Sequence, residues 1–143
     1  MSSPSSAEIF DRLHELLHLF RTRVRSRLEV LHPDLTLNEM RVLIHIGQNA
    51  GITQKGLIER SQTDKAQIAR ILAGLEERGL VERAPSDTDK RVRCLRLGKP
   101  GAALFTQLRD LQHEVAGQLL EHLPAGGRKQ LYGLLCQAVD DDR

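Results

Sequence analysis

The spacing of apolar residues predicts a long helix at the start of the chain. Apolar side chains recur every three or four residues at Ile9, Leu13, Leu16, Leu17, Phe20, Val24, Leu28 and Leu31. This pattern is typical of an amphipathic helix over residues 7–32, which Pro33 ends because the residue before a proline avoids the helical conformation. A helix of this length has to bury its apolar stripe against a bundle or a second chain.

A capping box predicts where the next helix begins. In the segment Thr36-Leu-Asn-Glu39, the threonine hydroxyl is placed to accept from the Glu39 backbone N–H, and the Glu39 side chain reaches back. We expect this helix to end near Gly47. Its apolar side consists of Leu37, Met40, Leu43 and Ile44.

Two shorter helices are predicted next, each preceded by a threonine. We expect Thr53 to cap a helix that runs to about Arg60, and Thr63 to cap another with Asp64 in its first turn, where the helix dipole favours an acid. Gly79 stands where a glycine commonly ends a helix. In the helix after Thr63, the fourth of the chain, the predicted buried stripe is formed by Ile68, Ile71, Leu72 and Leu75.

Two short runs with β character follow, at residues 80–84 and 92–97. The residues between them begin with Pro85-Ser-Asp-Thr-Asp89 and favour a turn, so the two runs are predicted to form a hairpin. Pro100 suits the first turn of a helix that continues to about His122. After a break at 124–127, a last helix carries Leu131, Leu134, Leu135 and Val139 on one side.

Composition adds limits on the fold and the compartment. The 143 residues suit one domain, and with one Tyr, three Phe and no Trp the core has to be built from aliphatic residues that favour helices. No apolar run approaches the roughly 20 residues that cross a bilayer, and residues 1–6 lack the apolar stretch of a secretory signal. Cys94 and Cys136 form no CxxC pattern. We therefore expect a cytoplasmic protein without membrane contact or a disulfide framework.

Charge is distributed unevenly, although the formal net charge is only +2. Between Thr53 and Leu97 there are ten basic and seven acidic residues, whereas the flanking segments have no basic excess. Lys90, Arg91, Arg93 and Arg96 form a run without an acid. Such a run suits a nucleic-acid partner, and the alternative is a merely solvated basic hairpin.

The order of elements in residues 53–97 favours binding to the grooves of duplex DNA. A recognition helix enters the major groove only if its outer face permits close approach. The predicted outer face of the fourth helix is composed of Ala66, Ala69, Arg70, Ala73 and Gly74, with Gln67 beside them. Arg suits guanine and Gln suits adenine, and each such contact discriminates between bases by about 1–3 kcal/mol.

Further candidate DNA contacts lie at helix starts and at the hairpin tip. Helix N-termini present free N–H groups that suit phosphate oxygens. The candidates for backbone contacts are Thr53, Gln54 and Lys55 at one helix start and Thr63 and Lys65 at the other. Asp89, Lys90 and Arg91 form the tip, which suits an adjacent minor groove.

Several motifs together resemble one family. They are Leu75-Glu-Glu-Arg-Gly-Leu-Val-Glu-Arg83, Asp87-Thr-Asp-Lys-Arg91, Leu95-Arg-Leu97 and Gly101. This succession is similar to that of the multiple-antibiotic-resistance (MarR) regulators, and the flanking long helices extend the resemblance over nearly the whole chain. The end of the recognition helix occurs in many winged-helix families, whereas the Asp-x-Arg wing motif is more specific.

The resemblance implies a mainly α fold, in which a three-helix core and a two-stranded wing lie between long dimerisation helices. It implies a single domain over residues 1–143, a DNA-binding lobe over 35–98, and dimerisation helices over 7–32 and 99–140. The function implied is a homodimeric regulator of a pseudo-palindromic operator, expected to be a repressor released by a small ligand. Arg91 would enter the minor groove and Asp89 would help to hold it.

The chain departs from the family pattern at Gly98, and its sequence does not locate an effector site. Gly98 replaces the Thr that is usual in the family, which implies a weaker cap for the next helix, by a few tenths of a kcal/mol. The family binds small, often aromatic, anions, yet the sequence assigns no ligand-binding site here. Plausible wall residues for such an effector are Arg41, His14, His18 and His45.

The alternatives to this hypothesis are a protein-assembly module, a metal- or thiol-responsive regulator, and an enzyme. A winged-helix module for protein assembly would leave the basic hairpin solvated. A metal- or thiol-responsive regulator would use His14 and His18, four residues apart, or Cys94 beside Arg93. An enzyme is not expected, because no phosphate loop, GxSxG motif or framed carboxylate pair occurs. We expect no catalytic residue, metal site or cofactor.

Overall fold

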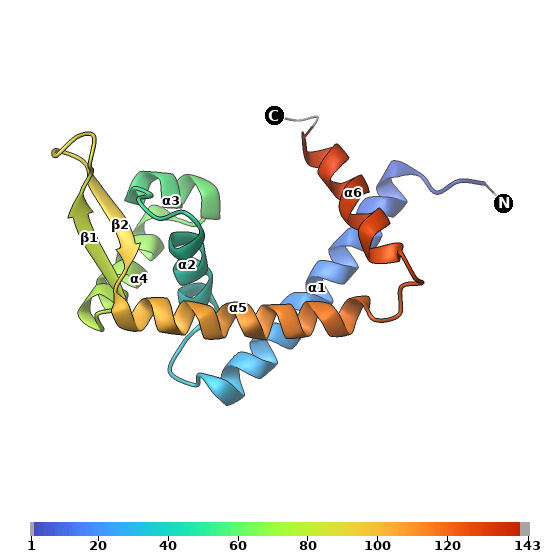
Figure 1. Ribbon diagram of the computed structural model, residues 1–143, viewed down its shortest axis with the longest axis horizontal. Coiled ribbons are helices and arrows are strands. Elements are labelled where there is room, and N and C mark those ends of the chain that lie inside the picture. Colours follow the sequence, from blue (N-terminus) through green and yellow to red (C-terminus); the bar gives the residue numbers. More distant parts are fainter. Residues whose placement is uncertain (1, 141–143) are drawn as a thin grey trace. The chain divides into compact units, whose positions relative to one another are not determined.

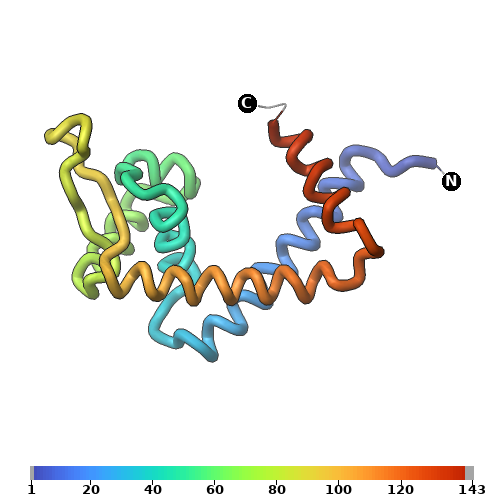
Figure 2. Tube along the Cα trace, viewed as in Figure 1, coloured from blue at the N-terminus to red at the C-terminus, as the bar shows by residue number. Residues whose placement is uncertain are grey.

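The computed structural model describes residues 2–140, which form six helices and a two-stranded antiparallel sheet (Figure 1). The predicted mainly α winged-helix architecture is confirmed. The trace in Figure 2 follows the elements in chain order. They are α1 (Ser6–Leu31), α2 (Leu37–Gln48), α3 (Gln54–Ser61), α4 (Lys65–Glu77), β1 (Val81–Pro85), β2 (Arg93–Leu97), α5 (Lys99–Leu120) and α6 (Gly127–Asp140).

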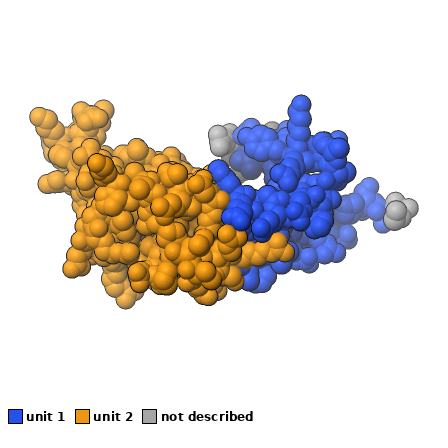
Figure 3. Space-filling view, turned by 60° about the horizontal axis from the view of Figure 1, so that its bottom comes forward, with its two compact units in different colours: residues 1–22, 113–143 blue, residues 23–112 orange. Residues whose placement is uncertain are grey.

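The chain divides into two compact units, coloured separately in Figure 3. Residues 23–112 form the first unit, which includes the expected DNA-binding segment 35–98 and is called the lobe from here on. The described parts of 1–22 and 113–143 form the second, the terminal unit. The boundaries fall within α1 and within α5. No helix of the described chain has the length and apolar character needed to span a bilayer.

The predicted caps of α2 and α3 are confirmed. The Thr36 hydroxyl accepts from the Glu39 N–H at 3.1 Å, and the Glu39 carboxylate accepts from the Thr36 N–H at 2.9 Å, so both halves of the capping box are formed. The Thr53 hydroxyl accepts from the N–H of Gly56 at 3.0 Å. Both helices therefore begin where the local sequence supplies a partner for backbone donors that would otherwise lack one.

The prediction that Thr63 caps α4 is wrong. Asp64 occupies the N-cap, and its carboxylate accepts from the N–H of Ala66 at 3.1 Å. Thr63 instead donates its hydroxyl hydrogen to the Ser61 carbonyl at 3.2 Å. Gln62 adopts a left-handed conformation, with φ of +52°, which lengthens the turn between the two helices. Both residue types cap well, so the path of the chain through this turn decides between them.

The core of the lobe is aliphatic, as the composition predicted. Nothing polar or charged is buried among the described residues. The completely buried side chains of α2, α3, α4 and β2 include Leu43, Ile46, Leu57, Ile68, Leu72, Leu75 and Leu95.

The β1–β2 hairpin pairs from Val81↔Leu97 to Pro85↔Arg93, about one residue from the predicted bounds of its strands. The sequence did not predict that a third segment joins it. Leu95 donates to the Ile52 carbonyl at 2.7 Å, and its own carbonyl accepts from Gly51 at 3.0 Å. The base of the wing is thereby attached to the connection between α2 and α3.

Close backbone contact joins the start of α5 to the end of α4. A Cβ atom at Gly101 would overlap the Leu80 carbonyl, and one at Gly98 would overlap the Gly79 carbonyl. The N–H of Gly98 also donates to the Leu80 carbonyl at 2.9 Å. The sequence suggested only that Gly98 weakens a cap. The structure gives it a packing role, because a side chain at this position would push α5 away.

Candidate nucleic-acid interface

The outer face of α4 has the surface that a recognition helix requires. Ala66, Ala69, Arg70 and Ala73 are exposed, and Gln67 is half-buried. They lie opposite Ile68, Leu72 and Leu75, which are completely buried. The small residues leave Arg70 as the long exposed side chain in the middle of this face, where another molecule is able to approach the helix closely.

The candidate backbone contacts lie at the starts of α3 and α4. Lys55 and Lys65 are exposed, while Thr53 and Gln54 are half-buried. The Thr53 hydroxyl accepts from Gly56, so its own hydrogen remains available to a phosphate oxygen. Thr63 differs, because its hydroxyl hydrogen is already donated within the turn. The roles assigned to these residues remain predictions.

The wing tip is shaped by hydrogen bonds to its own backbone. The Asp89 carboxylate accepts from the Arg91 N–H at 3.0 Å, and the Asp89 carbonyl accepts from Val92 at 3.0 Å. The Ser86 hydroxyl accepts from the backbone N–H groups of Thr88 and Asp89, at 3.3 and 3.4 Å. These bonds present the exposed Lys90 and Arg91 in the turn between β1 and β2. Asp89 thus holds the backbone of Arg91.

The basic side chains of the lobe differ in whether a carboxylate neutralises them. Three arginines near the base of the wing form ion pairs with carboxylates: Arg78 with Glu39 at 3.5 Å, Arg83 with Glu76 at 2.6 Å, and Arg96 with Glu82 at 3.3 Å. Within residues 2–140, no such pair is formed by Lys65, Arg70, Lys90 or Arg91. Their positive charge is therefore available to phosphates and base edges.

The structure divides the suggested effector-wall residues between the two units. Arg41 and His45 lie one turn apart on α2 and border a cavity of about 10 Å³ that Ser61 and Thr63 also line. That volume suits about one water molecule and no aromatic ligand. Burial, and then the charges of Arg41 and Arg60, lower the pKa of His45 below its ordinary value.

The remaining two histidines of that set lie on α1 in the terminal unit. The His14 ring is hydrogen-bonded to the Phe10 carbonyl at 2.8 Å. No three His, Cys, Asp or Glu side chains of residues 2–140 are grouped as metal ligands. Cys94 and Cys136 are half-buried free thiols, and Cys94 borders a groove of about 420 Å³ beside the wing. A sensing role for any of these groups stays untested.

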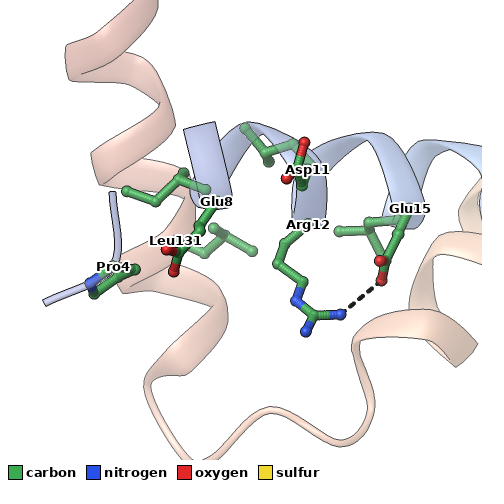
Figure 4. Close-up of a pocket in the computed structure, with 9 residues that line it drawn as sticks. Pro4, Glu8, Asp11, Arg12, Glu15 and Leu131 are labelled. Atoms are coloured by element: carbon green, nitrogen blue, oxygen red, sulfur yellow. Dashed lines mark hydrogen bonds and ion pairs between the residues drawn. The ribbon is translucent and has the colours of Figure 1, made fainter. Parts of the chain in front are cut away.

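The terminal unit exposes an apolar surface. An open groove of about 540 Å³ lies between the start of α1 and α6 (Figure 4). Its apolar wall contains Ile9, Leu13, Leu16 and Leu131, and its polar lining includes the Arg12–Glu15 ion pair at 2.9 Å. Other large apolar residues of the unit also expose much of their surface to solvent: 61% at Phe10, 72% at Tyr132 and 64% at Leu134.

Comparisons with known proteins match this chain to winged-helix regulators. Residues 34–92 match the model of the MarR family. The structure of the Multiple Antibiotic Resistance Repressor MarR is 28% identical, with a TM-score of 0.75 over 96% of each chain. Residues 34–92 thus match the MarR family, and the whole chain has the fold of the MarR structures. A mutant of MarR from E. coli, solved in complex with operator DNA, is 27% identical, with a TM-score of 0.68, and covers 91% of this chain and 92% of its own.

A more distant structure supports the fold alone. FabT from Streptococcus pneumoniae, in complex with DNA, is 20% identical, with a TM-score of 0.73, and covers 97% of this chain and 100% of its own. No curated protein sequence matches the chain. MarR proteins are transcription regulators and not enzymes. The matched segment contains every candidate DNA contact, from Thr53 to Arg91.

The sequence predicted none of the three ion pairs formed by Arg78, Arg83 and Arg96. Glu39 contacts Arg78, and Glu76 contacts Arg83, so both pairs involve the last turn of α4 or its cap. For Glu76 and Arg83 the signal in the sequence was opposite charge on either side of the Gly79 turn, whereas Glu39 and Arg78 lie far apart in the chain and gave no local signal. Many other pairs of charged residues satisfy that condition, and the fold selects among them.

Proposed function

We propose that this protein is a regulator of the MarR type, which binds operator DNA as a homodimer and regulates transcription from it. One observation carries the proposal. The outer face of α4 and the wing tip both present arginines that pair with no carboxylate among residues 2–140, whereas Arg78, Arg83 and Arg96 nearby are neutralised. A surface that keeps these cations unpaired suits a polyanion.

In this proposal α4 lies in the major groove. Arg70 donates to the O6 and N7 acceptors of guanine, and Gln67 pairs with adenine, which discriminates by about 1–3 kcal/mol for each contact. The alanines around Arg70 let the helix backbone approach the base edges. Lys55, Lys65 and the N-terminal turns of α3 and α4 contact phosphates, which positions the helix without reading sequence.

The wing completes the site in the adjacent minor groove. Arg91 enters that groove, where arginine is favoured if the groove is narrow. Asp89 orders the turn that carries it, at 3.0 Å from the Arg91 N–H. This role combines the motif resemblance with the hydrogen bond that holds the tip.

Dimerisation through the terminal unit is part of the proposal. Phe10, Tyr132 and Leu134 expose more than half of their surface, which is unfavourable in water unless a partner covers them. A second copy of the chain is the proposed partner, because two lobes then meet the two half-sites of a pseudo-palindrome about one helical turn apart.

The proposal also includes repression of transcription and release of the protein from its operator by a small ligand. Both rest on the family resemblance. A relative with 28% identity is named a repressor. A dimer that occupies an operator blocks transcription from it, and a small ligand that favours a different spacing of the two lobes weakens binding. The cavity beside Arg41 and His45 is too small for an effector of aromatic size, so the ligand would bind elsewhere.

The central test is binding to duplex DNA at several salt concentrations. Selection from a random duplex library supplies the operator, and fluorescence anisotropy measures affinity between about 50 and about 200 mM salt. We expect an inverted repeat to be selected and affinity to fall steeply with salt, by about 0.9 in log–log slope for each phosphate neutralised. Binding that is absent or independent of salt contradicts the proposal and favours a protein-assembly module.

A further inference from the structure

A short ion pair joins the recognition helix to the wing. The Arg83 Nε donates to the Glu76 carboxylate at 2.6 Å. Glu76 lies in the last turn of α4, and Arg83 lies in the middle of β1. Both side chains are about two-thirds covered, with 29% and 34% of their surface exposed. The pair is therefore better shielded from solvent than a typical surface ion pair.

The pair closes a turn that the backbone has already fixed at one side. Gly79 has φ of +73°, and its N–H donates to the Glu76 carbonyl at 3.0 Å. The Leu80 N–H donates to the Leu75 carbonyl at 2.9 Å, which completes the hydrogen bonding of a Schellman motif. These bonds end α4 and start β1, but they act only at the turn. The Glu76–Arg83 pair adds a second attachment farther along the hairpin.

The direction of the hairpin matters because the two arginines proposed to contact DNA lie on different sides of the turn that joins α4 to β1. Arg70 lies on α4, and Arg91 lies at the tip of the wing. Beyond Arg83, β1 continues for two residues, about 7 Å at about 3.3 Å per residue, and the turn that carries the tip follows. A rotation of about 10° at Arg83 displaces the end of β1 by about 1 Å and the tip beyond it by more, which exceeds the range of hydrogen-bond lengths.

We propose that Glu76 and Arg83 are positioning residues, which set the angle of the wing so that Arg70 and Arg91 engage DNA together. Neither residue touches the DNA. A phosphate contact by Arg83 would place the phosphate beside the Glu76 carboxylate, which repels it. The inference rests on the proposed DNA binding and adds the geometric coupling between its two arginines.

The lobe offers a matched control. Arg96 also pairs with a glutamate, Glu82, at 3.3 Å, but this pair links β1 only to β2. This pair is more exposed, since 62% of the Arg96 side chain and 51% of the Glu82 side chain are accessible to solvent. Both residues belong to the hairpin, so the pair does not attach it to α4. Arg96→Ala removes one positive charge from the wing, as Arg83→Ala does, without removing a link between the wing and the recognition helix.

The first arm of the test is a double-mutant cycle on DNA affinity. We expect Glu76→Ala and Arg83→Ala each to weaken binding to the selected operator by about three- to tenfold, and the double variant to be no weaker than the weaker single variant, since both remove one interaction. Arg83→Ala should leave the salt slope unchanged, and Arg96→Ala should bind within about twofold of an unaltered wing. A fall of about 0.9 in the slope would make Arg83 a phosphate contact and overturn the proposal. Additive losses, or an equal loss in Arg96→Ala, would overturn it too.

The second arm needs no DNA. Spin labels at Ala73→Cys and Lys90→Cys, in a background without Cys94 and Cys136, report the distance between the outer face of α4 and the wing tip. We expect a narrow distribution that Glu76→Ala broadens and Arg96→Ala does not. An unchanged distribution in Glu76→Ala overturns the positioning role. If the unaltered protein binds no duplex, the proposed function fails, and this distance measurement still decides the role of the ion pair.

Discussion

The carboxylate of Asp89 accepts a hydrogen bond from the backbone N–H of Arg91 at 3.0 Å. An acid therefore lies two residues from the arginine proposed to enter the minor groove, although its charge opposes DNA. Its hydrogen bond orders the wing tip, and this structural role explains why an acidic residue is compatible with the site. The two effects of Asp89, charge and shape, have opposite signs for binding and are separable by mutation.

Asp89→Ala is expected to weaken DNA binding by about fivefold, because the loss of one hydrogen bond costs about 1 kcal/mol and leaves the tip disordered. Asp87→Ala is the matched control, since it removes the same charge from the same turn without this bond to Arg91. It should raise affinity or leave it unchanged. Anisotropy titrations of both variants decide the matter, and equal behaviour would refute the shape role.

Arg70→Ala is expected to relax sequence preference at one position of each half-site, by about 1–3 kcal/mol. Lys65→Ala should instead weaken binding to all duplexes alike and lower the salt slope by about 0.9, as the loss of a phosphate contact does. Titrations against a panel of single-base operator variants distinguish the two patterns. An unaltered preference in Arg70→Ala would exclude base recognition by that residue.

Gly101→Ala is expected to destabilise the protein by about 1–3 kcal/mol, because its Cβ would overlap the Leu80 carbonyl and force α5 away from α4. Gly74→Ala is the control in the same lobe. A Cβ atom there meets nothing within 4 Å, so the higher helix propensity of alanine should stabilise the fold by up to about 1 kcal/mol. Thermal unfolding of the two variants in parallel measures the difference in sign.

His45 is expected to make stability depend on pH. Burial, followed by the charges of Arg41 and Arg60, lowers the pKa of His45 in the folded lobe. The unfolded chain therefore binds the proton more readily, and its pKa is about 6.5. The stability that the neutral ring contributes is complete above that pH and is lost as the pH falls below it.

His45→Gln, which does not titrate, tests this expectation. Urea unfolding of the variant between about pH 8 and about pH 5 should show a shallower loss of stability than the unaltered protein. The other histidines contribute equally to both proteins, so the difference between the curves belongs to His45. Parallel curves would contradict the assigned pKa direction.

Leu134→Glu is expected to convert the proposed dimer to a monomer, because it places a charge in an exposed apolar surface of the terminal unit. Val30→Glu is the control: Val30 is 79% exposed but belongs to the lobe. Sedimentation velocity measures both. A monomeric unaltered protein, or a dimer that survives Leu134→Glu, would exclude this surface as the dimer interface.

Features that depend on neighbours within about four residues could be predicted from the sequence. The capping box of Thr36 and Glu39, the Thr53 cap and the Gly79 helix end all form as expected, because each hydrogen bond closes within one turn of chain. The period of apolar residues likewise predicts α1, which begins and ends within a residue of the predicted bounds. The wing motif predicts which family the lobe resembles.

Tertiary structure alone decided the relations between distant segments. Opposite charges are common along the chain, so only the folded backbone selects Glu76 as the partner of Arg83 and leaves Arg70 and Arg91 without an ion pair to any carboxylate in the described part of the chain. The bridge from Ile52 to Leu95 and the contact of Gly101 with Leu80 depend on backbones that meet after folding. Local hydrogen bonds determine where each helix starts and stops, whereas packing determines which side chains meet, because many segments compete for each partner and only one arrangement buries the whole core.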